Sequence, residues 1–459
     1  MAGTAPDGPR RVRVGVLGCG NVGGALVELV DAEAPAIAAA TGLHLEVTKV
    51  AVRNLAKHRA AAVGAARLTH DAHGVATDPD VDVVVELVGG IEPARSLVVD
   101  ALKAGKPVVT ANKELLANVG AELRSVAEAS GRLLRFEAAV AGAVPLVRAL
   151  QVSLAGERIR RVVGIVNGTT NYVLTQMSEE RIGYAEALAE AQRLGYAERD
   201  PAADVEGYDA SAKAAILASI AFHADVVAGD VYREGIEAVD VGDIDFAHRL
   251  GYEVKLLAIA ERVEPVDGGA ERIAVRVHPA MVPAEHPLAG VRGPFNAVFV
   301  EGESAGELML YGRGAGGRPT ASAVLGDLIE AARSLDAPPP PPAPRHAPVE
   351  VSPIDELRTQ YYVTVDVVDR PGVLAQVAAA FGAHGVSIRS MEQVGMGEEA
   401  RLVFITHMAR EADLQATLSE LGSLEAVERT GGLLRVVGRE DERRAARHGG
   451  AAGGRHGEG

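Results

Sequence analysis

No tryptophan and only one cysteine, Cys19, occur among the 459 residues, and aromatic residues make up 3% of the chain. A single cysteine excludes an internal disulfide framework and a zinc site built from cysteines. No apolar run reaches the roughly 18 residues that a membrane-spanning helix needs, and the first ten residues lack the apolar centre of a signal peptide. Positive charge is also scarce: 46 Lys and Arg against 62 Asp and Glu give a formal net charge of −16. We therefore expect a cytoplasmic protein that binds neither nucleic acid nor membranes.

The clearest pattern lies near the N-terminus. Residues 11–17 (RVRVGVL) predict a strand, GCGNVG follows at residues 18–23, and residues 25–30 predict a helix. A strand, a glycine-rich turn and a helix in this order are typical of a Rossmann-type dinucleotide site. We expect Gly18 to permit the tight turn, Gly20 to let the backbone approach a pyrophosphate, and Gly23 to allow close contact between helix and strand. Cys19 in this turn is interpreted as a small filler.

The end of the second predicted strand, residues 45–52, bears on the choice of cofactor. An NAD-selective site usually places an acidic residue there, which bonds the ribose 2′-hydroxyl. This chain has Arg53 instead, with Lys57 one turn later. Two cations favour the 2′-phosphate of NADP, although both can equally be solvated surface charges.

A third unit comprises a buried strand at residues 81–88, a helix at 93–104 and a strand at 107–110. It leads into TANKELLA, residues 110–117. Ligands of doubly wound sheets lie at the carboxyl ends of the strands, so Lys113 is expected at the crevice between cofactor and substrate. The alternative is a surface lysine at a helix N-terminus, which is an unfavourable position for a cation.

The segment at residues 195–213, GYAERDPAADVEGYDASAK, has the strongest catalytic signal. It leads into a predicted helix at 210–222, where Asp209 and Lys213 share one face because they are four residues apart. A carboxylate can orient the amine and tune its pKa, and such a lysine can exchange a proton with a substrate oxygen. The alternative is an ordinary surface ion pair worth about 0.3–0.5 kcal/mol.

The remainder of the middle region predicts a sheet covered by helices. The expected strands are residues 132–138, 161–166, 273–278 and 297–301, and a helix is expected at 319–332. NGTTNY, residues 167–172, predicts a compact polar turn or a helix N-cap. A second glycine-rich turn, YGRGAGG, spans residues 311–317 and precedes the last of these helices.

GCGNVG, TANKELLA, NGTTNY, the 195–213 segment and YGRGAGG together resemble the homoserine dehydrogenase family over about residues 11–335. The resemblance implies reversible hydride transfer between NAD(P)H, with NADP(H) preferred, and L-aspartate 4-semialdehyde, giving L-homoserine. It implies that Lys213 donates the proton, that Asp209 and Glu198 bind the substrate, and that Lys113 lies near nicotinamide and substrate. Arg313 departs from the family, which often has proline at this position of YGRGAGG.

The resemblance also implies a cofactor site and a monovalent cation site, the cation being Na+. The implied cofactor residues are Gly18, Gly20, Asn21, Val22, Gly23, Arg53, Lys57, Lys113, Gly195 and Gly314. The cation site, built largely from backbone carbonyls, falls on Glu137, Val140, Gly142 and Val144.

The C-terminal part follows a proline-rich stretch, residues 337–348, that predicts a stiff spacer between two independently folded units. Beyond it the pattern predicts βαββαβ, a ferredoxin-like order, with DRPGVL at residues 369–374 at the first strand–helix junction. This resembles an ACT domain, which implies L-threonine as a regulatory ligand held by backbone N–H groups at residues 370–374. A dimerisation module without a ligand is the alternative.

The predicted fold class is α/β, with a doubly wound Rossmann domain, an α+β substrate and dimerisation domain and a ferredoxin-like domain. The predicted divisions are a flexible arm (1–10), the Rossmann domain (11–150), the substrate domain (151–335, returning to the Rossmann domain near 312–335), a linker (336–356), the ACT domain (357–438) and a disordered tail (439–459). A homodimer or homotetramer is expected. Two other functions stay open: a dehydrogenase for another amino-acid semialdehyde, and a non-catalytic, nucleotide-gated amino-acid sensor.

Overall fold

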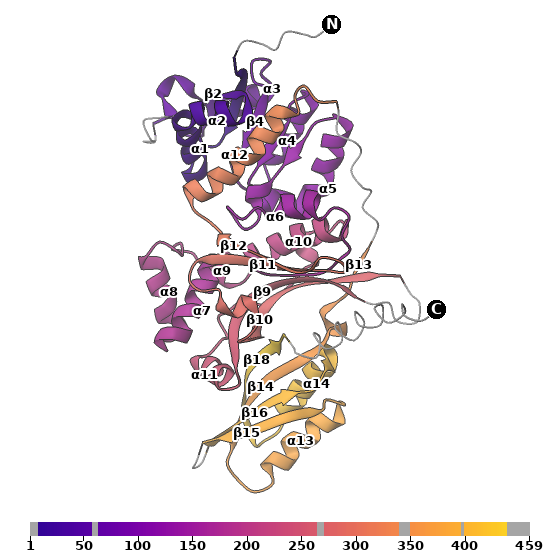
Figure 1. Ribbon diagram of the computed structural model, residues 1–459. Coiled ribbons are helices and arrows are strands. Elements are labelled where there is room, and N and C mark those ends of the chain that lie inside the picture. Colours follow the sequence, from indigo (N-terminus) through magenta and orange to yellow (C-terminus); the bar gives the residue numbers. More distant parts are fainter. Residues whose placement is uncertain (1–7, 57–62, 264–269, 339–348, 396–398, 438–459) are drawn as a thin grey trace, which may run out of the picture.

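The computed structural model describes residues 8–56, 63–263, 270–338, 349–395 and 399–437. Three modules follow one another along the length of the molecule (Figure 1). Several predictions lie outside the described residues: Lys57, most of the N-terminal arm, most of the proline-rich stretch and the tail. The described part of the chain holds no helix long and apolar enough to cross a membrane.

The N-terminal module is built on a six-stranded sheet with the order β3-β2-β1-β4-β5-β6, all pairs parallel. The doubly wound prediction is confirmed, and the switch point lies between β1 and β4, where such folds place a ligand. The strands are β1 (Arg10–Leu17), β2 (Leu43–Ala51), β3 (Leu68–Thr69), β4 (Val83–Glu86), β5 (Val108–Thr110) and β6 (Leu134–Arg135). Because β1 already begins at Arg10, the structured part starts one residue earlier than predicted.

Helices cover both faces of this sheet. They are α1 (Asn21–Ala32), α2 (Ala34–Thr41), α3 (Ala72–Thr77), α4 (Ala94–Lys103), α5 (Lys113–Ala129) and α12 (Gly317–Arg333). Helix α12 comes from far along the chain and lies beside α1 (Figure 1). Its buried residues Ala321, Val324 and Leu328 join Leu26 and Val27 of α1 in one hydrophobic cluster. The chain thus returns to the N-terminal module after building the middle one.

The middle and C-terminal modules share one sheet, whose main path runs β12-β11-β7-β9-β10-β18-β14-β16-β15. Its middle-module strands are β7 (Ile159–Ile165), β9 (Tyr252–Val263), β10 (Arg272–Pro283), β11 (Phe295–Gly302) and β12 (Gly306–Arg313). The predicted division into two independently folded units stays a prediction, but the two modules are joined by strand pairing. Strand β18 pairs with β10 at Ala280 and Met281, so the C-terminal module continues the sheet of the middle one.

The C-terminal module, residues 349–437, has the predicted βαββαβ order. Its main elements are β14 (Arg358–Val368), α13 (Val373–Ala383), β15 (Ile388–Val394), β16 (Glu399–Thr406), α14 (Glu411–Leu421) and β18 (Val427–Val436). Tyr361, Phe381 and Phe404 are fully buried in a hydrophobic cluster of its own. The ferredoxin-like prediction is confirmed.

Two predicted elements differ from the structure. The strand expected at residues 132–138 ends after β6 and gives way to a 3-10 turn, Glu137–Ala139. NGTTNY opens helix α7 (Gly168–Glu180), since the Asn167 side chain accepts the Thr170 N–H at 2.8 Å and caps it. The N-cap alternative was therefore the right one.

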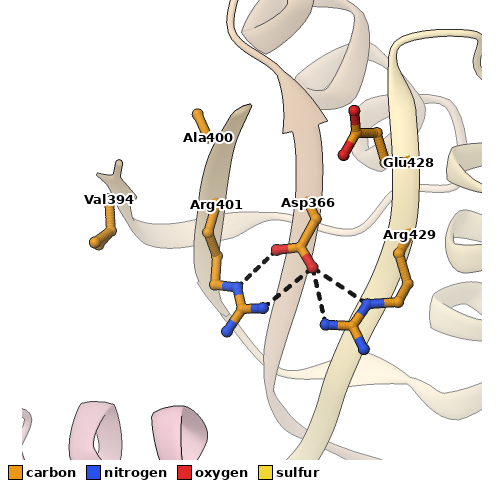
Figure 2. A pocket seen from close by; sticks show the side chains of 6 residues that line it. All are labelled: Asp366, Val394, Ala400, Arg401, Glu428 and Arg429. Carbon is orange, nitrogen blue, oxygen red and sulfur yellow. Dashed lines mark hydrogen bonds and ion pairs between the residues drawn. The ribbon is translucent and has the colours of Figure 1, made fainter. Parts of the chain in front are cut away.

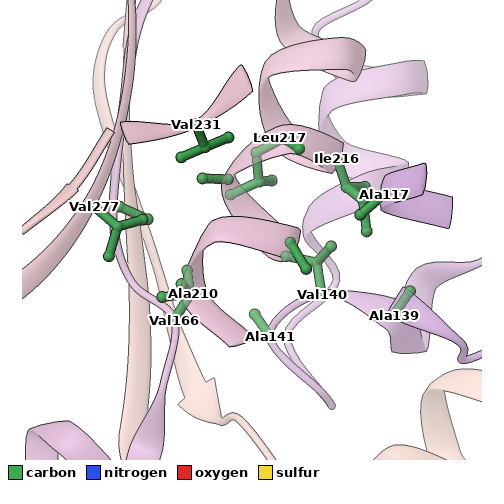
Figure 3. Packing of buried hydrophobic residues seen from close by; sticks show 14 of the residues in the cluster. Ala117, Ala139, Val140, Ala141, Val166, Ala210, Ile216, Leu217, Val231 and Val277 are labelled. Atoms are coloured by element: carbon green, nitrogen blue, oxygen red, sulfur yellow. The ribbon is translucent and has the colours of Figure 1, made fainter. Parts of the chain in front are cut away.

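Helix α10 (Tyr208–Phe222) lies at the centre of the molecule, and all its residues from Asp209 onward are buried. A helix that is apolar all round belongs in a protein interior. Figure 3 shows Ala210, Ile216 and Leu217 of this helix between Val277 of β10 and Ala117 of α5. Any polar side chain on α10 is therefore held in a rigid, dry position.

Candidate active site

Asp209 and Lys213 of α10 form a buried pair. Lys213 Nζ donates to Asp209 Oδ2 at 2.6 Å and to the Val166 carbonyl at 2.7 Å. The side chains are only 5% and 10% exposed, so the surface ion-pair alternative is wrong. Asn296 Nδ2 also donates to the Val166 carbonyl at 3.0 Å, which fixes the acceptor that orients the lysine.

The other oxygen of Asp209 pairs with Lys113, the first residue of α5. Asn112 caps this helix, because its Oδ1 accepts the Leu115 N–H at 3.1 Å. The buried Asp209 carboxylate compensates the cation at this helix N-terminus, where it would otherwise be unfavourable. One carboxylate thus joins two ammonium groups from two modules.

Asn167 completes the cluster from the start of α7. Its Nδ2 donates to Asp209 Oδ2 at 2.8 Å and to Asp204 Oδ1 at 2.7 Å, while its Oδ1 caps α7. Asp204 lies in α9 (Ala202–Val205), directly before α10. The amide therefore fixes the distance between the starts of three helices.

The electrostatics distinguish the two lysines. Burial lowers the pKa of Lys213, and Asp209 offsets this only in part. Burial also opposes the charge on Lys113, but the Asp209 carboxylate more than compensates and raises the pKa of Lys113. Burial opposes ionisation of Asp209 too, yet the two ammonium groups hold its pKa far below the ordinary value. Lys213 is therefore the more readily deprotonated of the two lysines, which suits a group that exchanges a proton with substrate.

The glycine-rich turn after β1 has the geometry that its sequence predicts. Gly18 has a φ of +96°, and a Cβ there would lie 2.5 Å from the Leu87 carbonyl oxygen. A Cβ on Gly23 would lie 2.4 Å from the Gly18 carbonyl oxygen, whereas Gly20 has open space around it. The turn leaves room at Gly20 for a ligand that contacts backbone.

The YGRGAGG loop packs against the predicted cation turn. A Cβ on Gly142, whose φ is +58°, would lie 2.4 Å from the Gly314 carbonyl oxygen, and the Ala143 N–H donates to the Arg313 carbonyl at 3.1 Å. A Cβ on Gly314 would lie 2.1 Å from the Asn296 side chain. Through Asn296 the two loops adjoin the lysine cluster.

Comparisons with known proteins agree with this arrangement. Family models for the NAD-binding domain of homoserine dehydrogenase, for homoserine dehydrogenase and for the ACT domain match residues 18–137, 145–329 and 361–426. The homoserine dehydrogenase of Mycobacterium bovis is 49% identical over 440 residues, which cover 94% of this chain and 99% of that protein. The chain belongs to the homoserine dehydrogenase family. It is accordingly an oxidoreductase, and the non-catalytic sensor hypothesis is set aside.

Solved homoserine dehydrogenases have the same fold. The enzyme from Thiobacillus denitrificans gives a TM-score of 0.88 at 39% identity, covering 94% of this chain and 99% of that one. A hyperthermophilic archaeal homoserine dehydrogenase, solved in complex with NADPH, gives a TM-score of 0.58 at 27% identity, covering 73% of this chain and all of that one.

Some residues that the homoserine dehydrogenase resemblance singled out lie apart from the lysine cluster. Glu198 and Gly195 lie in the exposed loop after α8 (Tyr184–Arg193), where the Glu198 carbonyl accepts from Gln192 at 3.0 Å. Arg53 is exposed just after β2. Arg313 lies over the ring of Phe295, with Cζ 5.5 Å from the ring centre.

Other residues of the site carried no usable sequence signal. Asp204 and Asn296 reach the cluster only through tertiary packing. Glu86 of β4 is fully buried. Its carboxylate accepts the Val88 N–H at 2.7 Å and the Thr110 hydroxyl at 2.6 Å, which ties the loop after β4 to the end of β5.

The ACT module has a hollow of about 360 Å³ on its sheet (Figure 2). Asp366 accepts there from Arg401 Nε at 2.6 Å and Arg429 Nη2 at 3.0 Å. At the start of α13, the Arg370 N–H already donates to the Val368 carbonyl at 3.0 Å. Part of the predicted carboxylate cradle is therefore occupied by the chain itself.

Proposed function

We propose that the chain interconverts L-aspartate 4-semialdehyde and L-homoserine, with Lys213 as the proton donor in the direction of reduction. The observation that carries this proposal is the buried Lys213 ammonium, 2.6 Å from Asp209 and with a lowered pKa. When bound, the nicotinamide supplies or accepts the hydride.

The chain's own residues account for the proton and the charge. Reduction of an aldehyde places negative charge on its oxygen, which an ammonium in a dry site stabilises strongly. Lys213 Nζ then donates its proton to that oxygen and becomes a neutral amine, which its lowered pKa favours. Lys113, with a side chain 45% exposed, connects the cluster to solvent for reprotonation. The exposed Glu198 carboxylate is the proposed contact for the substrate's ammonium group.

NADP(H) is the proposed preferred cofactor. Arg53 lies exposed at the carboxyl end of β2, where NAD-selective sites have an acidic residue. The solved archaeal relative in complex with NADPH supports this choice. Gly18, Gly20, Asn21, Val22 and Gly23 would receive the pyrophosphate at the start of α1.

A monovalent cation, Na+, is proposed at residues 137–144. Within the described ranges, the carbonyls of Val140 and Gly142 accept no hydrogen bond from the chain, whereas the Val144 carbonyl accepts Leu146 N–H at 2.8 Å. The Glu137 carboxylate is occupied by the N–H groups of Val147 and Arg148. Glu137 would therefore contribute its carbonyl, which also accepts the Val140 N–H at 3.4 Å. Oxygen ligands without added charge suit a monovalent ion, which would rigidify the turn beside the YGRGAGG loop.

L-Threonine is the proposed ACT ligand, and a homodimer or homotetramer in the cytoplasm is the proposed assembly. Strand β12 supports assembly because it is an edge strand whose Leu308, Met309 and Tyr311 are 38%, 40% and 52% exposed. Exposed apolar edge strands invite pairing with another chain.

The direct test is oxidation of L-homoserine with NADP and with NAD, followed at the nicotinamide absorbance. We expect turnover with both and a higher kcat/KM with NADP. Turnover of another amino alcohol but not of homoserine would instead support the alternative of a dehydrogenase for another amino-acid semialdehyde. Repeating the assay with Na+ exchanged for a large organic cation tests the proposed cation site. Repeating it with added L-threonine tests the proposed ACT ligand.

A further inference from the structure

A buried arginine joins the ACT module to the middle module. Arg435 of β18 has a side chain only 2% exposed. Its guanidinium makes two bonds to Glu411 of α14, at 2.9 and 2.8 Å, and two bonds of 2.8 Å to Glu234 of the middle module. Paired bonds from a planar guanidinium fix orientation as well as distance. The Glu234 carboxylate is therefore held by the ACT module, while the Glu234 N–H donates to the Val277 carbonyl of β10 at 2.8 Å.

Glu234 directly follows a short strand, β8 (Tyr232–Arg233), which pairs with β10. Successive side chains of an extended segment point to opposite sides. Tyr232 and Glu234 accordingly face Arg435, whose Cζ lies 5.2 Å from the Tyr232 ring centre. Arg233 points the other way, and its Cζ lies 3.5 Å from the ring centre of Tyr208. Tyr208 is the first residue of α10.

The backbone of this segment also touches the turn between α9 and α10. Gly207 caps α10 with a φ of +83°, and a Cβ there would lie 3.1 Å from Arg233 Cγ and 3.3 Å from the Glu234 carbonyl oxygen. The Ile236 N–H donates to the Val205 carbonyl at 2.9 Å. Close packing transmits displacement, so residues 232–236 and this turn move together.

This turn carries the acids of the active site. Asp204 lies just before it and Asp209 just after it, and Asn167 bonds both. A shift of the turn would move Asp209 and Lys213 relative to Asn167, Val166 and Lys113, which lie on other elements. No group of the ACT module needs to approach the substrate for this effect.

We propose that Arg435 is a positioning residue for the reaction, holding residues 232–236 against the start of α10 and thereby fixing Asp209 and Lys213. The proposal rests on the proposed role of Lys213. It gives the ACT module a physical path to the active site, because a ligand that displaces β18 would displace Asp209 through Glu234 and Tyr208.

The test compares full-length variants on both sides of β8. Arg435→Ala and Glu234→Gln weaken the contact between the ACT module and β8. Arg233→Ala removes the contact between β8 and Tyr208 of α10. We expect each to lower kcat for homoserine oxidation by about tenfold, since small misplacements of reacting groups are costly, with KM for NADP within about twofold of the unchanged protein. Arg435→Lys should recover part of the loss caused by Arg435→Ala.

Tyr362→Phe is the matched control. It removes another buried bond between the two modules, from the Tyr362 hydroxyl to Asp243 of α11 (Val241–Arg249) at 2.9 Å, without touching β8. We expect it to lower the melting temperature and leave kcat unchanged. An equal loss of kcat in this control would show general loosening and overturn the proposal.

Arg233 is partly exposed and outside the buried network, so Arg233→Ala decides the matter if the Arg435 variants do not fold. Folded Arg233→Ala and Glu234→Gln proteins with normal kcat would overturn the proposal. Failure of the proposed function looks different: the unchanged protein would not oxidise homoserine, or Lys213→Ala would do so at the normal rate.

Discussion

Replacing Asp209 by asparagine tests the central electrostatic claim, because the shape is kept while the charge shared by two lysines is removed. Asp209 accepts from Lys213 at 2.6 Å and from Asn167 at 2.8 Å, and it pairs with Lys113. An amide has only one acceptor oxygen, and its NH2 group would face donors. The variant therefore loses both charge compensation and hydrogen bonds.

The magnitude follows from Coulomb's law for a close ion pair. Two unit charges about 4 Å apart interact by about 4 kcal/mol at an effective dielectric constant of about 20, and one pKa unit corresponds to about 1.4 kcal/mol. Removing an interaction of this size would lower the pKa of Lys213 by about three units. Since water entering the altered site would reduce the effect, we expect a fall of at least about one unit.

The assay is the pH dependence of kcat for homoserine oxidation. In this direction the neutral amine of Lys213 accepts the proton, so the rate falls on the acid side of its pKa. Asp209→Asn should move this acid limb to lower pH by about one unit or more. Asp204→Asn is the control, since Asp204 also binds Asn167 but raises the pKa of Lys213 less than Asp209 does, so its acid limb should move less. An acid limb that stays in place or moves to higher pH in Asp209→Asn would refute the reasoning.

Three further predictions concern single side chains. Lys213→Ala should lose about 10²–10⁴-fold in kcat while its dissociation constant for NADP, measured by calorimetry, stays unchanged; normal turnover would remove Lys213 from the mechanism. Arg53→Ala should raise KM for NADP by about tenfold or more, as a lost charge-assisted bond is worth about 1.5–3 kcal/mol, and equal losses with NAD would mean that Arg53 does not bind the 2′-phosphate. Burial raises the pKa of Asp327 to about 6, so its folded carboxyl group keeps a proton that the unfolded chain releases near pH 4. Its contribution to stability is therefore complete below about pH 4 and lost as the pH rises to about 6. Over this pH window the melting temperature of Asp327→Asn should fall less than that of the unchanged protein. Melting temperatures of the two proteins that fall equally with pH would contradict this.

The sequence was informative wherever a local pattern decides the structure. The spacing of Asp209 and Lys213 predicts a shared helix face, and the structure places their charged atoms 2.6 Å apart. Gly18 has the positive φ that its turn requires. Helices and strands with clear apolar patterns were located to within a few residues, as for α10 and α12.

Other features depend on contacts between distant parts of the chain. The pairing of Lys113 with Asp209 joins two modules, and nothing in either local sequence encodes it. Strand β12 escaped prediction because its residues are largely exposed on both faces, which leaves no alternating pattern. The pairing of β10 with β18 could not be predicted from the sequence either. A proline-rich spacer indicates that two units are separate, whereas strand pairing depends on how the edges of their sheets meet.

The return of α12 to α1 has a consequence for synthesis on the ribosome. About 300 residues separate the end of α1 at Ala32 from the end of α12 at Arg333, which at roughly 5–20 residues per second takes about 15–60 s to translate. For that time the part of α1 that packs against α12 lacks its covering helix. Chaperones that hold exposed apolar surface have an opportunity to act in this interval.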